Sequence, residues 1–211
     1  EQAAYQVMER KGARAVSVIV MNPQNGEIYA MVNAPEFHLN APFSLEEGDG
    51  AASGKEKQDL LNAMWRNRCI NDTYEPGSIF KSVTMLACLE EGVVKPSTKV
   101  FCPAKLKADE YTISDAHERG DTTYTATEIM QHSSNVGISL ATEQAGFDKL
   151  YDNIKRFHFT ESTGVDYPGE AAGNVLDFDN WAKITGYNVS FGQGIAVTPL
   201  QMARFYSAIA N

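Results

Sequence analysis

Ser78 and Lys81 are the residues whose types and spacing first suggest chemistry. They lie three positions apart in a segment typical of a helix, so their side chains share one face, one turn apart. A serine hydroxyl is a weak nucleophile at neutral pH, and a neighbouring lysine can take its proton only if burial or another cation keeps the amine neutral. The pair therefore predicts a nucleophile, Ser78, with Lys81 as its base. Taken alone the spacing is weak support, because any serine and lysine three apart on a helix match it.

The surroundings of this pair strengthen the prediction. Residues 78–91 are mainly apolar, Pro76 and Gly77 precede them, and Gly92 follows, which predicts a buried helix that starts at Ser78. The amide groups and dipole at the start of a helix favour negative charge developing nearby. An unpaired charged lysine on a buried helix is costly, so this lysine should be exposed, paired or functional.

A second polar group, Ser133, Ser134 and Asn135, lies about fifty residues further on. Residues 125–128 carry a capping box that opens one helix, and residues 136–145 predict the next, so the group lies at a corner between helices. A hydroxyl and an amide at this corner can bridge a lysine and bind a peptide-like substrate. A serine pair before asparagine is more often a helix cap, and the residues alone leave both interpretations open.

The elements that must position these groups follow from periodicity and turn residues. Two β-prone runs, 15–20 and 28–32, are joined by a turn containing Asn-Gly and predict a hairpin. Further helices are predicted over 1–11, over 147–157, and from Pro199, after the capping residue Thr198, to the end of the sequence. Irregular connections are expected over 35–58 and 164–170.

Composition limits the class of protein. With 211 residues, 43% of them hydrophobic, the chain can bury a core, and we interpret it as one domain. A net charge of −9 argues against nucleic-acid binding, which requires a basic face. No apolar run of about 18 residues predicts a membrane span.

The cysteines and histidines do not predict a metal site, a cofactor or a disulfide framework. Their spacing lacks the CxxC and HxxxH patterns of such sites, and we expect the thiols to be buried. The residues concerned are Cys69, Cys88, Cys102, His38, His117, His132 and His158.

Several segments resemble one enzyme family. Residues 67–81, NRCINDTYEPGSIFK, look like the active-serine segment of class B penicillin-binding proteins, and residues 133–135 resemble their SxN motif. Residues 163–170 and 190–199 are also similar to segments of that family, in the same order, and the hairpin with its turn at 22–27 is similar to the first two strands of its sheet. The resemblance covers nearly the whole chain.

The resemblance implies an α/β fold of the penicillin-binding protein and serine β-lactamase type, in which an antiparallel sheet packs on helices and a second lobe is mostly helical. It divides the chain into residues 1–92, with the hairpin, the connection and the nucleophile helix, residues 93–190, the mostly helical lobe with the SxN motif, and residues 191–211, where the chain starts to return to the sheet lobe. The third family motif, Lys-Ser/Thr-Gly, is not found in the sequence. In the family it follows the helix that ends near Asn211, so we expect an incomplete transpeptidase domain without its C-terminal strands.

The implied activity is that of a peptidoglycan D,D-transpeptidase. Ser78 would attack the carbonyl between the two terminal D-alanines of a stem peptide and pass the acyl group to an amine on a neighbouring strand. Lys81 would carry the proton, assisted by Ser133. The substrate-binding residues would be Asn135, which hydrogen-bonds the substrate amide, and Ser134. β-Lactam antibiotics would acylate the same serine, and no cofactor or metal is implied.

The family also implies partners and a location. The stem peptide and β-lactams would be ligands, other wall-synthesis proteins would be partners, and no nucleic acid is expected. The full-length protein would be anchored in the bacterial cytoplasmic membrane and would face outward.

Two other functions remain open. A β-lactam sensor or non-catalytic wall-assembly scaffold of the same fold would explain the missing third motif. A β-lactamase would need a base that activates water for deacylation, and the carboxylates of Glu161 and Glu170 lie in about the right region, although neither lies in a segment like those of lactamases. A Ser-His-Asp hydrolase is poorly supported, because no GxSxG segment is present.

Overall fold

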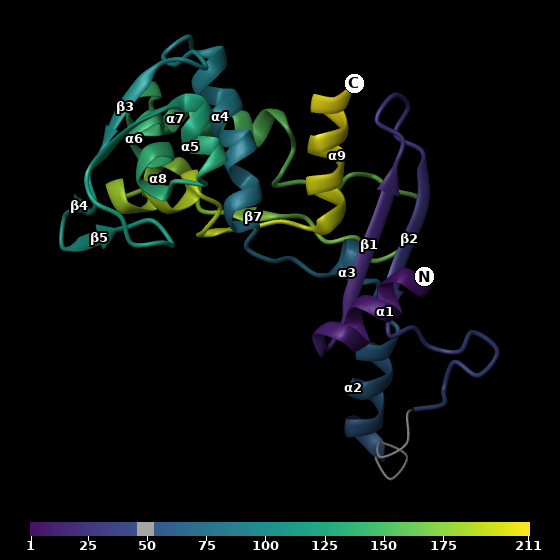
Figure 1. Cartoon of the computed structure of the whole chain (residues 1–211). Helices are drawn as coiled ribbons and strands as arrows, with labels where there is room; N and C mark the ends of the chain where they lie inside the picture. The colour runs from purple at the N-terminus through teal and green to yellow at the C-terminus, as the bar shows by residue number, and fades with distance from the viewer. Residues whose placement is uncertain (46–52) are drawn as a thin grey trace. The chain divides into compact units, whose positions relative to one another are not determined.

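A computed structural model describes residues 1–45 and 53–211 of the chain (Figure 1). The chain forms two compact units. The first, which we call the hairpin unit, comprises Glu1–Asp72, Asp166–Ala171 and Thr198–Asn211. The second, the helical unit, comprises Thr73–Val165 and Ala172–Val197. Within the described residues, each sheet consists of two antiparallel strands.

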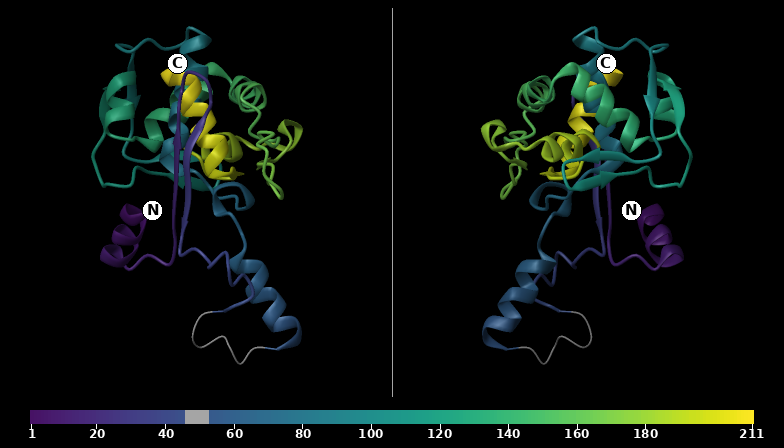
Figure 2. Two further views of the ribbon diagram at one scale, coloured as in Figure 1. Left: turned by 90° about the vertical axis from the view of Figure 1, so that its right-hand side faces the viewer. Right: turned by 90° about the vertical axis from the view of Figure 1, so that its left-hand side faces the viewer.

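The hairpin unit is built around one long β-hairpin (Figures 1 and 2). Strand β1 pairs with β2 so that Val18 lies opposite Val32, and Gly26 in the connecting turn has φ +77°. Helices α1, α3 and α9 contact this hairpin or one another. The elements of the unit are α1 (Gln2–Lys11), β1 (Val16–Met21), β2 (Ile28–Ala34), α2 (Gly54–Met64), α3 (Arg68–Asn71) and α9 (Pro199–Ala210).

Local signals explain where these helices begin and end. Helix α1 ends at Gly12, whose left-handed φ of +62° a residue with a side chain rarely adopts. Helix α9 begins after Thr198, whose hydroxyl accepts from the backbone N–H of Gln201, while the Gln201 side chain accepts from the Thr198 N–H. The predicted hairpin and the helices predicted over 1–11 and from Pro199 are therefore confirmed.

The helical unit carries both groups singled out by the sequence. Helix α6 is its centre, because it contacts α4, α5, α7, α8 and β3. Its elements are η1 (Gly77–Phe80), α4 (Lys81–Glu90), β3 (Lys99–Cys102), β4 (Leu106–Ala108), β5 (Tyr111–Ile113), β6 (Thr122–Thr125), α5 (Ala126–Gln131), α6 (Asn135–Ala145), α7 (Phe147–Arg156), β7 (Asn174–Val175), η2 (Phe178–Asn180), α8 (Lys183–Ser190) and β8 (Ile195–Ala196).

A hydrophobic core holds these elements together. Apolar side chains from the helices pack against others from the short strands, and burying each large one contributes about 1.5–3 kcal/mol. The core is formed by Met85, Cys88, Val94, Cys102, Ala108, Ile113, Ala126, Ile129, Val136, Ile138, Ala141, Tyr187 and Phe191. All three cysteines are free and buried, as expected.

The structure corrects two predictions and adds elements that were not predicted. The helix expected from Ser78 begins as a single 3-10 turn, and the α-helix itself starts at Lys81. The connection expected over 35–58 is shorter, because α2 starts at Gly54, and residues 46–52 of that connection lie outside the described residues. The short strands between Lys99 and Thr125, and helices α3 and α8, were not expected. In the part of the chain that the structure describes, no helix has the length and apolar character needed to cross a membrane.

Candidate active site

Lys81 is the centre of a polar cluster inside the helical unit. Lys81 is the first residue of the buried helix α4 and is only 1% exposed. The amine nitrogen Nζ lies 2.6 Å from the backbone oxygen of Ser133 and 2.7 Å from Oδ1 of Asn135. The Oγ atoms of Ser133 and Ser78 lie 3.0 Å and 3.2 Å away. The structure therefore brings together four of the groups that the sequence singled out.

The types of these four oxygens limit where protons can lie. The backbone oxygen of Ser133 and the amide oxygen of Asn135 can only accept, so each takes one N–H of Lys81. The remaining position on the tetrahedral nitrogen faces the two hydroxyls. In the charged amine this position holds a third N–H, and in the neutral amine it holds a lone pair. A neutral Lys81 can thus accept a proton from Ser78 without breaking its two shorter hydrogen bonds.

Burial makes the neutral form accessible. It lowers the pKa of Lys81 from 10.5 to about 8, and the negative charge of Asp115 opposes this shift. With a pKa of about 8, roughly a tenth of the amine is neutral at pH 7. An unperturbed lysine would be neutral in fewer than about one molecule in a thousand at that pH.

Ser78 is an exposed residue, and the backbone just before it is fixed by close contact. Gly77 has φ +59°, and its N–H donates to the backbone oxygen of Gly192 at 2.9 Å. A Cβ atom on Gly192 would lie 2.2 Å from the Gly77 oxygen, so no other residue fits there without displacement. Tyr74 and Val197 exchange two further backbone hydrogen bonds in the same region. The segment that carries Ser78 is therefore anchored through main-chain contacts.

The corner at Ser133 points two oxygens at the amine. Ser133 has φ +51°, an unusual conformation for a residue with a side chain, which costs on the order of 1–3 kcal/mol. The Ser133 N–H donates to the oxygen of Met130, and the next N–H along the chain donates to the oxygen of Ile129. This tight turn ends α5 and lets the carbonyl and the hydroxyl of Ser133 approach the same nitrogen.

Ser134 does not lie where a substrate-binding residue is expected. Its side chain is fully buried, and its Oγ accepts from the backbone N–H of Gly137 at 2.9 Å, which caps α6. The same hydroxyl donates to the carboxylate of Asp115. Ser134 therefore has a structural contact on each side and is not open to a ligand. Ser134 caps a helix, as one interpretation of the serine pair expected, while its two neighbours contact the amine.

Asn135 connects the amine to a surface groove. Its Oδ1 accepts from Lys81, and its Nδ2 donates to the backbone oxygen of Ser114 at 3.1 Å. A groove of about 480 Å³ adjoins it, with polar walls from Asn188 and Gln193 and apolar walls that include Phe191. None of the side chains that line this groove is charged. An uncharged groove with amide groups suits a peptide-like ligand.

Asp115 and Arg119 are the functional candidates that sequence reasoning missed. Asp115 accepts from Arg119, from Ser134 and from the N–H of Val136. Burial alone would raise the pKa of Asp115, but these hydrogen bonds outweigh it and hold that pKa below the usual value. No motif surrounds this pair in the sequence, so no local signal could have found it.

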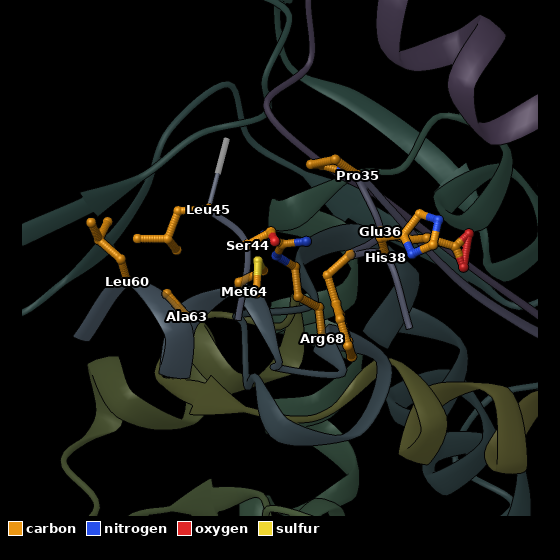
Figure 3. A pocket seen from close by; sticks show the side chains of 10 residues that line it. Pro35, Glu36, His38, Ser44, Leu45, Leu60, Ala63, Met64 and Arg68 are labelled. Atoms are coloured by element: carbon orange, nitrogen blue, oxygen red, sulfur yellow. The ribbon is translucent and has the colours of Figure 1, made fainter. Parts of the chain in front are cut away.

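A separate pocket of about 400 Å³ lies in the hairpin unit (Figure 3). Leu45, Leu60 and Met64 line it together with the charged side chains of Arg68 and Glu36. It contains none of the residues that the sequence predicted for catalysis or substrate binding. Among the described residues, no group of three or more His, Cys, Asp or Glu side chains could hold a metal ion.

Comparison with known proteins gives one consistent result. A family model described as "Penicillin binding protein transpeptidase domain" matches residues 16–211. Penicillin-binding protein PbpB of Mycobacterium tuberculosis is 33% identical over 211 residues, which cover 100% of this chain and 29% of that protein. Peptidoglycan D,D-transpeptidase FtsI of Escherichia coli is 31% identical over 199 residues, which cover 94% of this chain and 31% of that protein.

Solved structures agree with the sequence comparisons. The crystal structure of penicillin binding protein 3 from Mycobacterium tuberculosis, complexed with aztreonam, matches with a TM-score of 0.85 and 33% identity, and the match covers 100% of this chain and 44% of that one. The transpeptidase domain of Burkholderia pseudomallei penicillin-binding protein 3 matches with a TM-score of 0.80 and 27% identity, over 99% of this chain and 54% of that one. The chain thus spans less than a third of these two curated relatives and about half of these solved chains.

Proposed function

The chain belongs to the penicillin-binding protein transpeptidase domain family, and we propose that the protein is a peptidoglycan D,D-transpeptidase in which Ser78 is the nucleophile. The observation that carries the proposal is the position of the buried Lys81 amine, 3.2 Å from the Ser78 hydroxyl and held by two acceptors that leave it free to take a proton. The names of the similar proteins support the same reaction class.

The proposed reaction has two transfers. The Ser78 oxygen attacks the carbonyl carbon between the two terminal D-alanines while Lys81 accepts the hydroxyl proton. The peptide C–N bond breaks, the leaving D-alanine takes that proton, and an ester to Ser78 remains. An amine from a second stem peptide then attacks the ester carbonyl and loses a proton to Lys81. The new C–N bond of the cross-link forms, the ester C–O bond breaks, and Lys81 returns the proton to the serine oxygen.

The other residues of the cluster have supporting roles in this proposal. The Ser133 hydroxyl lies 3.0 Å from the amine and relays or orients the proton. The second N–H of the Asn135 amide donates to a substrate carbonyl, since the first donates to the backbone oxygen of Ser114. The Ser78 amide lies in the first turn of a helix, where N–H groups lack intrahelical acceptors, and it supplies part of the oxyanion hole.

β-Lactams, stem peptides and other wall-synthesis proteins are the proposed partners, and the outer side of the bacterial cytoplasmic membrane is the proposed location. Two solved structures of one relative, penicillin binding protein 3 of Mycobacterium tuberculosis, are complexes with aztreonam and with ampicillin, which supports acylation of Ser78 by such compounds. The β-lactamase alternative gains no support from Glu161, which pairs with His158 while both side chains are more than half exposed.

Acylation by benzylpenicillin tests the nucleophile. The full-length protein should gain the mass of one benzylpenicillin molecule, and Ser78→Ala should gain none. Ser97→Ala is the matched control, because Ser97 is an exposed serine of the same unit, and it should be acylated like the parent. An adduct that persists in Ser78→Ala would refute the assignment of Ser78.

A second assay separates transfer from binding alone. The protein is incubated with a stem pentapeptide ending in D-Ala-D-Ala and a second peptide that offers an amine. Release of D-alanine together with a cross-linked product supports a transpeptidase. A stable penicillin adduct without cross-linked product would instead support the sensor or scaffold, and rapid hydrolysis of the penicillin would support the β-lactamase.

A further inference from the structure

Asp115 and Arg119 form a largely buried charged pair beside the corner at residues 133–135, and the proposed reaction uses neither. Their side chains are only 10% and 15% exposed. Nε of Arg119 donates to Oδ2 of Asp115 at 2.5 Å, and Nη1 donates to the backbone oxygen of Cys102 at 2.9 Å. The guanidinium also lies 5.5 Å from the centre of the Tyr124 ring. The pair is therefore held by β3 and β6 as well as by its own loop.

The carboxylate of Asp115 contacts the corner at two points. Its Oδ1 accepts from the backbone N–H of Val136 at 3.0 Å, and its Oδ2 accepts from the Ser134 hydroxyl at 2.9 Å. Ser134 and Val136 flank Asn135 in the chain, so the carboxylate fixes the residues on both sides of it. Hydrogen bonds to an ionised carboxylate are roughly twice as strong as neutral ones.

The backbone of Ser133 and the burial of Arg119 both bear on this support. Ser133 is held at a positive φ, which persists only when the surroundings impose it. Nη2 of Arg119 is buried and has no hydrogen-bond partner among the described residues, which is costly for a charged group. A buried guanidinium with an unsatisfied donor adds little to stability by itself. Its bond to Asp115 instead indicates that it holds the Asp115 carboxylate in place.

We propose that Asp115, held by Arg119, is a positioning residue that keeps the corner at residues 133–135 folded around the Lys81 amine and thereby sets how well that amine activates Ser78. This inference rests on the proposed function of the same site. Neither Asp115 nor Arg119 touches Ser78, so both act through Lys81 and its oxygen contacts.

The charges of Asp115 and Arg119 should shift the pKa of Lys81 in opposite directions. Burial lowers the pKa of Lys81, and the charge of Asp115 acts against burial and raises it. Removal of the negative charge should therefore lower the pKa of Lys81 further, whereas removal of the Arg119 charge, which leaves Asp115 unbalanced, should raise it.

The test measures the rate of acylation by benzylpenicillin in the full-length protein from pH 6 to pH 10. Asp115→Asn should lower the limiting rate about 10- to 100-fold, because the corner loses its charged acceptor, and should move the midpoint of the pH profile to lower pH. Arg119→Gln should move the midpoint to higher pH. Asp121→Asn is the matched control, because Asp121 accepts from the Ala104 N–H instead of from the corner, and it should match the parent.

The outcomes separate this inference from the proposed function. No acylation of the parent protein would refute the proposed function and the inference with it. Normal acylation of the parent, together with an unchanged limiting rate and midpoint in Asp115→Asn, would overturn the inference alone. Midpoints that move in the same direction in both variants would also overturn it. If thermal melting shows that Asp115→Asn does not fold, Arg119→Gln decides, and an unchanged or lowered midpoint there contradicts the inference.

Discussion

The pH dependence of Ser78 acylation is the sharpest consequence of the buried lysine. Only the neutral amine can take the serine proton, and burial lowers the pKa of Lys81 to about 8. The neutral fraction is then about 1% at pH 6, about 9% at pH 7 and about half at pH 8. The acylation rate should rise about ninefold from pH 6 to pH 7 and level off above about pH 9.

The assay is the second-order rate of acylation by a fluorescent penicillin, which reports the pKa of the free enzyme. Lys81→Arg keeps a positive charge that no accessible pH removes, and it should lose acylation by a factor of about 10²–10⁴ at every pH. Lys105→Arg is the matched control, since Lys105 is an exposed lysine of the helical unit, and it should keep the parent profile. A parent rate that does not change between pH 6 and pH 9, or a midpoint near that of an exposed lysine, would refute the reasoning.

Two further predictions concern the scaffold. Gly192→Ala would place a Cβ atom 2.2 Å from the Gly77 oxygen at a residue with φ +81°, so we expect a loss of about 1–3 kcal/mol in the free energy of unfolding and slower acylation. Gly120→Ala, where the added atom meets nothing within 4 Å, should change neither, and equal effects of the two substitutions would contradict the steric argument. Thr125→Ala removes the capping box of α5 and should cost about 1 kcal/mol in urea unfolding, with the pH midpoint of acylation unchanged; a shifted midpoint would show that the cap also acts on the site.

Much of the fold follows from local signals in the sequence. The Asn-Gly turn and the helix ends at Gly12 and Thr198 are set by residues within a few positions of one another, and the structure agrees with them. The short strands β3 to β6 give no such signal, because three or four residues are too few to establish an alternating pattern. The family and the α/β fold that the resemblance implied are confirmed by the comparisons.

Only part of the candidate active site could be predicted from the sequence. The spacing of Ser78 and Lys81 predicted their contact, because one helical turn fixes it. The approach of Ser133 to the amine depends on packing between residues 52 positions apart; the residues alone left it open beside a helix cap, and the resemblance favoured it. Asp115 lies 19 positions from Ser134, in a loop without a motif, and its contacts became visible only in three dimensions. The roles of these residues and the division of the chain inferred from the resemblance stay predictions.

The segment around Ser78 also has long-range contacts through side chains, and these bear on the order in which the chain folds. Thr84 donates to the oxygen of Ser190, 106 positions away, and Glu75 accepts from the N–H of Gly194, 119 positions away. A growing chain that has not yet reached Ser190 lacks these partners, so its nucleophile segment is unanchored however well α4 forms. Contacts over such separations form late and slowly. During synthesis, the reactive serine should therefore mature only after most of this chain has been made.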